Sequence, residues 1–339
     1  MKTMKCCILI TCLFIVTANL RAQDPAFSQF FSSPLNINPA LTANINSDWR
    51  LITNLRDQWI GPASPYVTGT VSFDTKVMQN KAPNMPENNF IGLGGMLMFD
   101  HAMSGVVKSS YGSLNLSYNV KLTEGYYTER LGIGFGAIYG HRRIDFSRID
   151  FEEQFTGFGF NRNLPTGETA LSNMKAYVSA SAGITYSATS EQSNFDIGLA
   201  AFHLNKPRQT FLKDEQQVLA IRKVAHANYE RYLNDQLIIN ANGIYQYQAK
   251  ASYFSVGTAL GYFLGDAAQT LLTAGIWYWS DNAVIPYIGM AYKDLQFGIS
   301  YDITTSKLNE AARRPNTWEF SMILRGTKRS TGVIPCPWK

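Results

Sequence analysis

Four histidines are the first residues in this sequence that could do chemistry: His101, His141, His203 and His226. Metal motifs in proteins place two histidines or cysteines a few residues apart, so that both reach one ion. None of the four has a second ligand at such a spacing. The sequence therefore predicts no metal site and no cofactor.

A lipid-cleaving enzyme is the catalytic alternative, and it needs a serine, a histidine and an orienting amide close together. His141 and His203 could serve as its base, but nothing in the neighbouring sequence selects a nucleophile. The acidic residues Asp150, Glu152 and Glu153 lack the spacing of a calcium loop. We therefore predict no catalytic residues and no enzymatic activity.

Aromatic residues gather near the C-terminal third of the chain. Trp277, Tyr278 and Trp279 are consecutive, and Tyr287 and Tyr292 follow. Such clusters are typical of the aromatic girdle at a membrane interface, and a carbohydrate platform is the alternative.

The N-terminal 22 residues have the pattern of a secretory signal. Two lysines in Met1–Lys5 precede the apolar run Ile8–Val16, which is too short for a transmembrane helix of ~20 residues. Cleavage after Ala22 would leave Gln23 at the new N-terminus, and cleavage after Ala18 is the alternative. The chain is thus expected to be exported.

Removal of this signal changes the cysteine count and the charge. Three of the four cysteines leave with it, so Cys336 remains and no internal disulfide can form. The net charge of +5 loses three cations and becomes +2, which gives no indication of nucleic-acid binding.

The composition of the exported chain favours a membrane barrel. Aromatic residues make up 13% and charged residues only 16% of the sequence, whereas the mean hydropathy is a modest −0.13. In a barrel wall only every second residue meets lipid, so a transmembrane barrel can have such an average. We predict an all-β fold, a transmembrane antiparallel β-barrel in the outer membrane.

Strict alternation of apolar and polar residues supports this fold along the whole chain. In Leu295–Thr304, leucine, phenylalanine, isoleucine and tyrosine alternate with polar or small residues, as in a strand between lipid and water. Turn signals divide the chain into fourteen such segments, with twelve or sixteen as alternatives. The segments are 48–57, 65–76, 89–99, 108–122, 129–143, 173–187, 193–204, 221–231, 236–249, 251–264, 269–281, 283–293, 294–304 and 316–326.

The connections between these segments differ in length. Lys293–Asp294 and Ser280–Asn282 are tight. Four others are long and polar: Val77–Asn88, Ile144–Ser172, Asn205–Ala220 and Thr305–Pro315. Outer-membrane barrels have short turns in the periplasm and long loops outside, so we expect the long connections at one end.

Residues 23–47 precede the first strand and resist assignment to a regular element. Pro25, Pro34 and Pro39 argue against a helix and against strand pairing, because proline lacks a backbone donor. The segment nevertheless carries five large apolar residues: Phe27, Phe30, Phe31, Leu35 and Ile37. We expect an irregular segment packed on or in the barrel, and the glycines that alternate in Leu131–Tyr139 suggest that something packs inside.

The expected organisation is therefore a signal peptide (1–22), an irregular N-terminal segment (23–47), an outer-membrane barrel (48–326) and a tail (327–339).

Several motifs together resemble the PorP/SprF family of type IX secretion membrane proteins. They are Gln23-Asp24-Pro25, Phe27, Gln29-Phe30, Asn38-Pro39-Ala40, Arg56-Asp57-Gln58-Trp59, Ser72-Phe73-Asp74, Ile144–Ser147, Phe202–Pro207, His226 with Asn228-Tyr229, and Cys336-Pro337. The resemblance covers nearly the whole exported chain.

This resemblance implies a non-enzymatic barrel of the secretion or gliding machinery. Its implied partners are outer-membrane lipid, the C-terminal domain of a secreted surface adhesin, and periplasmic ring or peptidoglycan-binding components. A structural part of the periplasmic ring, or a small-solute or lipid channel, are the alternatives. Carried over from the family motifs, the candidate partner-binding residues are Gln23, Asp24, Pro25, Phe27, Gln29, Asn38, Pro39, Arg56, Gln58 and Trp59. Among these we expect Arg56, Gln58 and Trp59 to hold the N-terminal segment, unless Arg56 and Trp59 only mark the headgroup interface.

Overall fold

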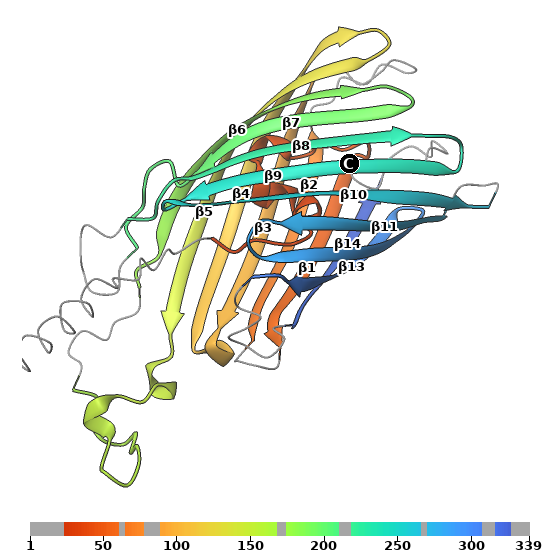
Figure 1. Ribbon diagram of the computed structural model, residues 1–339. Helices are drawn as coiled ribbons and strands as arrows, with labels where there is room; N and C mark the ends of the chain where they lie inside the picture. Colours follow the sequence, from red (N-terminus) through yellow and green to blue (C-terminus); the bar gives the residue numbers. More distant parts are fainter. Residues whose placement is uncertain are drawn as a thin grey trace, which may run out of the picture.

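Fourteen antiparallel strands close into a single barrel (Figure 1). The structure is a computed structural model that describes residues 24–60, 65–77, 89–167, 174–209, 218–265, 270–306 and 316–326. Each strand pairs with its neighbours in sequence, and the first strand pairs with the last along its whole length. The predicted fold class is confirmed, and the expected signal peptide and tail lie outside the described residues.

The strands follow the predicted segments closely. Their bounds are β1 Trp49–Ile60, β2 Tyr66–Val77, β3 Phe90–Ala102, β4 Val107–Glu124, β5 Thr128–Ile144, β6 Tyr177–Thr189, β7 Ser193–Phe202, β8 Arg222–Tyr232, β9 Leu237–Gln248, β10 Ala251–Leu264, β11 Thr270–Trp279, β12 Ala283–Tyr292, β13 Leu295–Thr304 and β14 Asn316–Gly326. Six short helical turns complete the elements: η1 Phe30–Ser32, α2 Pro34–Ile37, η2 Pro39–Leu41, η3 Met103–Gly105, η4 Phe146–Arg148 and η5 Glu152–Gln154. None of the described helices is long and apolar enough to cross a membrane.

The two faces of the wall differ as the alternation predicts. On β4, the side chain of Leu114 is 74% exposed, whereas Ser113 and Asn115 beside it are buried. Because successive side chains of a strand point to opposite faces, the apolar set meets lipid and the polar set lines the lumen. The buried residues thus lie inside the barrel.

The two ends of the barrel carry different connections. The β5–β6, β7–β8 and β13–β14 connections are long and share one end, called here the loop end. The opposite, turn end carries the tight β4–β5, β6–β7, β8–β9 and β12–β13 connections, together with the start of β1 and the end of β14.

Several connections depart from the expected alternation, and the two-residue β9–β10 connection at the loop end is one of them. Successive connections lie at opposite ends, so the long β2–β3 connection falls at the turn end and the tight Ser280–Asn282 turn falls at the loop end. Connection length alone therefore does not assign an end. The residues of the β2–β3 connection itself lie outside the described part.

Candidate functional site

Residues 24–48, called here the lumenal segment, run through the interior of the barrel (Figure 1). Asp24 lies near the loop end, beside the last residue of β9, and Ala43 lies near the turn end, beside Asp74 of β2. Asn46 is the one exposed residue of this segment. The segment therefore crosses the lumen before β1 begins.

The lumenal segment folds into three short helical turns, so the expectation of no helix is corrected. Pro34 begins α2 and Pro39 begins η2, positions where the missing proline N–H costs no hydrogen bond. The Asn38 side chain accepts a hydrogen bond from the Ala40 backbone at 2.8 Å and so caps η2. Each of these two prolines thus begins a new helical turn.

Aromatic residues of the wall receive the apolar side chains of the segment. The Phe31 ring lies 4.8 Å from the Trp277 ring and 5.5 Å from that of Tyr287. Trp277 is 1% exposed and donates its indole N–H to Asn242 Oδ1 at 2.7 Å. The girdle prediction is therefore wrong for the inward-facing Trp277, Trp279 and Tyr287. Tyr278 and Tyr292 face outward, and for these two residues the girdle stays a prediction.

A buried ion cluster fixes the first part of the segment, shortly after Asp24. Arg56 Nη2 lies 2.8 Å from Asp302 Oδ2, and Arg56 Nη1 lies 3.1 Å from Glu319 Oε2. The Glu319 carboxylate also accepts the backbone N–H groups of Ser28 and Gln29 at 2.7 and 2.8 Å. The barrel closes where β1 pairs with β14. The cluster joins β1 to β13 and β14 across this seam and holds Ser28 and Gln29 of the segment.

A second ion pair fixes the segment near the turn end. Arg50 donates two hydrogen bonds to the Asp74 carboxylate, at 3.0 and 2.7 Å. Asp74 Oδ2 also accepts the backbone N–H of Ala43 at 2.7 Å. This fork geometry orients the carboxylate toward the segment.

A third cluster holds Asp24 near the loop end. Asp24 Oδ2 lies 2.7 Å from His203 Nε2 and 3.2 Å from Arg222 Nε, and the Asp24 backbone N–H donates to Gln248 Oε1 at 2.9 Å. Burial raises the pKa of Asp24, but the charge of Arg222 and the hydrogen bond with His203 outweigh it and lower the pKa below its ordinary value. Asp24 is therefore an anion in this cluster.

The same cluster contains a Ser–His–Asp chain. The Ser179 hydroxyl lies 2.7 Å from His203 Nδ1, on the other side of the imidazole from Asp24. The Ser179 side chain is 0% exposed, so a substrate has no access to its hydroxyl. The chain joins the wall to the lumenal segment, and we assign it a structural role.

Glycines of the wall leave the space that the segment occupies. A Cβ atom on Gly134 would lie 2.2 Å from the Ala40 backbone nitrogen, and one on Gly183 would lie 2.0 Å from Asn38 Oδ1. Asn38 also donates to the carbonyl oxygens of Ile184 and Leu199 at 3.1 and 3.3 Å. The prediction that small lumenal residues accommodate something inside is confirmed.

The candidate residues from the family motifs mostly belong to this interior. Asp24, Gln29, Asn38 and Arg56 take part in the contacts above, and Phe27 and Pro39 are buried and Pro25 is half-buried. Gln23 lies outside the described residues. Their part in partner binding stays a prediction.

Gln58 and Trp59 lie at the loop end of β1, away from these clusters. Trp59 packs edge-on against Tyr66, with 5.0 Å between ring centroids. Neither residue forms a hydrogen bond or ring contact with the described lumenal segment. Of the three residues expected to hold that segment, Arg56 alone contacts it.

Sequence reasoning missed several partners of the segment: Asp74, Arg222, Asp302 and Glu319. Each is a charged residue on the inner face of an alternating strand. A buried charge on such a face requires a partner, and this signal could have identified them.

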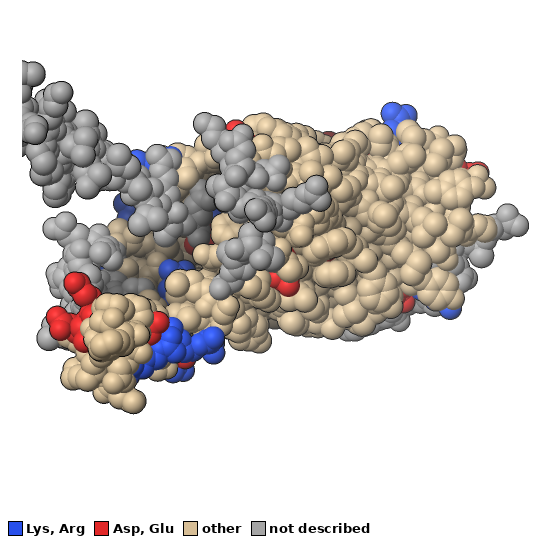
Figure 2. All heavy atoms as spheres, turned by 60° about the horizontal axis from the view of Figure 1, so that its bottom comes forward, with Lys and Arg blue, Asp and Glu red and all other residues tan. Residues whose placement is uncertain are grey.

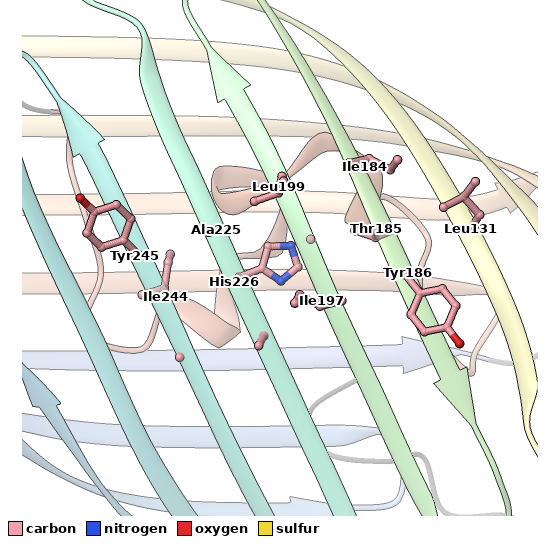
Figure 3. A pocket seen from close by; sticks show the side chains of 13 residues that line it. Leu131, Ile184, Thr185, Tyr186, Ile197, Leu199, Ala225, His226, Ile244 and Tyr245 are labelled. Atoms are coloured by element: carbon pink, nitrogen blue, oxygen red, sulfur yellow. The ribbon is translucent and has the colours of Figure 1, made fainter.

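Two apolar grooves lie on the outer wall. One, of about 520 Å³, lies over β6–β9, where the small residues Ala225, Ala227 and Gly243 leave space beside Leu199 and Tyr245 (Figure 3). In the described part of the chain, no three His, Cys, Asp or Glu side chains come close enough to hold a metal ion.

The family model described as type IX secretion system membrane protein PorP/SprF matches residues 19–324. No curated protein matches the chain. Among solved structures, the CymD monoaromatic hydrocarbon channel is 10% identical, with a TM-score of 0.48 over 87% of this chain and 93% of that chain. The Pseudomonas putida toluene transporter TodX is 11% identical, with a TM-score of 0.47 over 89% of this chain and 94% of that chain. A KdgM porin is 7% identical, with a TM-score of 0.40 over 81% of this chain and 98% of that chain.

Proposed function

We propose a function from the premise that this chain belongs to the PorP/SprF family of type IX secretion system membrane proteins. It is a non-enzymatic outer-membrane barrel of the secretion machinery. Its role in our proposal is to hold a large secreted surface adhesin by the adhesin's C-terminal domain during export and anchoring.

The occupied lumen is the observation that carries this proposal. The lumenal segment contacts the wall at three charged clusters and packs against the aromatic residues of β11 and β12. Removing one partner from such a cluster leaves an uncompensated buried charge, which is strongly unfavourable. An interior closed in this way favours the holding of a protein at the outer rim over the passage of solutes.

The β5–β6 connection offers a surface for that partner at the loop end. Its described part folds on itself, because Arg162 pairs with Asp150 at 2.7 Å and the Gln154 amide donates to Leu164 O at 2.9 Å. Its tip exposes three phenylalanines, Phe155 at 55%, Phe158 at 104% and Phe160 at 55%. Exposed aromatic clusters of this kind are typical of protein interfaces.

The buried family-motif residues have an indirect role in this proposal. They set the position of the lumenal segment, and the segment in turn supports the inner wall beneath the loop end. The outer loops then contact the adhesin.

A co-purification experiment tests the proposal. The tagged protein is isolated from outer membranes in mild detergent, and the proteins bound to it are identified by mass spectrometry. We expect a very large surface protein, captured through its C-terminal domain, and its loss when Phe155, Phe158 and Phe160 are replaced by serine. The matched control replaces the exposed Tyr126 and Tyr127, at the turn end, and retains the partner.

The alternatives predict other outcomes of the same experiment. Recovery of periplasmic ring or peptidoglycan-binding components, unaffected by the phenylalanine changes, would favour a structural part of the machine. Steady ion conductance of the intact protein in planar bilayers would favour a channel, whereas we expect conductance only after residues 24–41 are deleted.

A further inference from the structure

Two cationic side chains and a histidine form a row across the outer face of β3, β4 and β5 near the loop end. His101 pairs with Lys108, and Lys108 pairs with Arg143. All three are exposed on the outer, membrane-facing side. Side chains at directly paired positions of neighbouring strands lie about 5 Å apart at Cβ, so these groups share one small patch.

Arg148, just after β5, extends this patch. A Cβ atom on Gly105 would lie 3.5 Å from Lys108 Cε and 3.7 Å from Arg148 Nη1, so both side chains end beside the same glycine. In Figure 2, blue atoms gather beside the folded β5–β6 connection, next to a wall almost free of charge.

Asp145 is the acidic group that faces this patch. Its hydrogen bond from Ser147 lowers its pKa, and the charges of Arg148 and Lys108 add to this effect. Lys108, Arg143 and Arg148 have no ion-pair partner in the described part of the chain. Three cations against one carboxylate leave a charge of +2, and like charges at paired positions repel each other. The patch is therefore suited to an anion with two negative charges.

An apolar groove of about 660 Å³ lies on the same strands, toward the middle of the barrel wall. Its lining includes Gly95, Leu114 and Ala137, which pair with one another and lie six residues along their strands from His101, Lys108 and Arg143. At about 3.3 Å per residue and a tilt near 40°, six residues correspond to roughly 15 Å of membrane depth. That is about half of a hydrocarbon core of ~30 Å.

We propose that this face of β3–β5 binds a phosphorylated membrane lipid. The phosphate group of its head lies among Lys108, Arg143 and Arg148, and an acyl chain lies in the groove over Gly95 and Ala137. A phosphate monoester carries a charge of nearly −2, which would balance the +2 of the patch. The site adds a lipid-binding activity that is independent of the proposed holding of an adhesin.

Native mass spectrometry of the detergent-released barrel tests this proposal, with diphosphorylated lipid A as the probe. We expect Lys108→Gln/Arg143→Gln to weaken lipid A binding about tenfold or more, since both cations attract the anionic head group near the membrane surface. The matched control, Lys223→Gln/Arg231→Gln, removes two exposed cations of β8 and should bind as the unchanged protein does. Gel electrophoresis verifies that each variant is folded, because a folded barrel migrates faster in the unheated sample than after heating.

A second variant tests the groove separately. Ala137→Phe fills the groove without changing the charges, and we expect it to weaken lipid A binding while leaving binding of inorganic phosphate unchanged. Equal lipid A binding by the unchanged protein and the double variant would overturn the proposal. Displacement of lipid A by inorganic phosphate at equal concentration would do the same, because it would indicate a site for the free anion.

Discussion

At the scale of single residues, Arg56 is the central contact of the interior. It bridges two carboxylates from β13 and β14, contacts Ser28, and lies 5.2 Å from the Trp279 ring. Replacing Arg56 by alanine leaves Asp302 and Glu319 buried without a cation. We expect a loss of about 3 to 5 kcal/mol of unfolding free energy, measured by urea titration in bilayers. Lys223→Ala, at an exposed cation, serves as the control, and an equal effect of both changes would contradict this role of Arg56.

Asp24 gives a residue-scale prediction with a pH dependence. A carboxyl whose pKa is depressed in the folded protein stabilises it above the unfolded pKa, and this contribution is lost as the pH falls through the folded value. Asp24→Asn should lower the unfolding free energy by about 2 kcal/mol at pH 7. The difference from the unchanged protein should stay constant from about pH 8 to 5 and narrow below about pH 4.

Urea midpoints across that pH range provide the measurement. Asp281→Asn, in an exposed turn at the loop end, is the control and should have little effect at any pH. A difference for Asp24→Asn that narrowed already near pH 6 would assign the effect to another group.

At the scale of elements, the fit between β5 and the lumenal segment depends on backbone contact. Gly134→Ala places a Cβ atom against the Ala40 backbone, so that the backbone of β5 or of the lumenal segment must shift. We expect a cost of about 1 to 3 kcal/mol and faster proteolysis of residues 24–48. The control is Gly112→Ala on β4, whose Cβ would face outward at 3.6 Å from Leu97 Cδ2. Equal proteolysis of the two variants would mean that the segment is held without this contact.

At the scale of the whole molecule, the two ends of the barrel should face different compartments. The loop end carries most of the long connections, and single-chain barrels place these outside. We expect Phe158→Cys to react with a membrane-impermeant maleimide in intact cells, and Asn234→Cys, in the β8–β9 turn, only after the outer membrane is opened. Both are made with Cys336→Ser to remove background labelling. The reverse labelling pattern would mean that the loop end faces the periplasm, and the proposed lipid patch would then lie in the inner leaflet of the outer membrane.

Most of the wall could be predicted from the sequence, because period-two alternation depends on neighbouring residues alone. For β13 (Leu295–Thr304), the predicted bounds 294–304 agree with the structure within one residue, and the predicted apolar and polar faces agree as well. The docking of residues 24–48 could also be predicted, because large apolar side chains between prolines require a buried surface. Whether they pack on or in the barrel stayed open in the sequence.

The tertiary structure alone decided which groups meet inside. Trp277 and Tyr278 both fit an alternating strand, and only the closed barrel determines that Trp277 faces Phe31. Asp24 and His203 are 179 residues apart, and Ser28 and Glu319 are 291 apart, so no local pattern relates them. The closure of β1 on β14 brings these partners together. The sequence thus determined the strands and most of their faces, and the closure determined the contacts, because pairing across a lumen depends on barrel geometry and not on neighbouring residues.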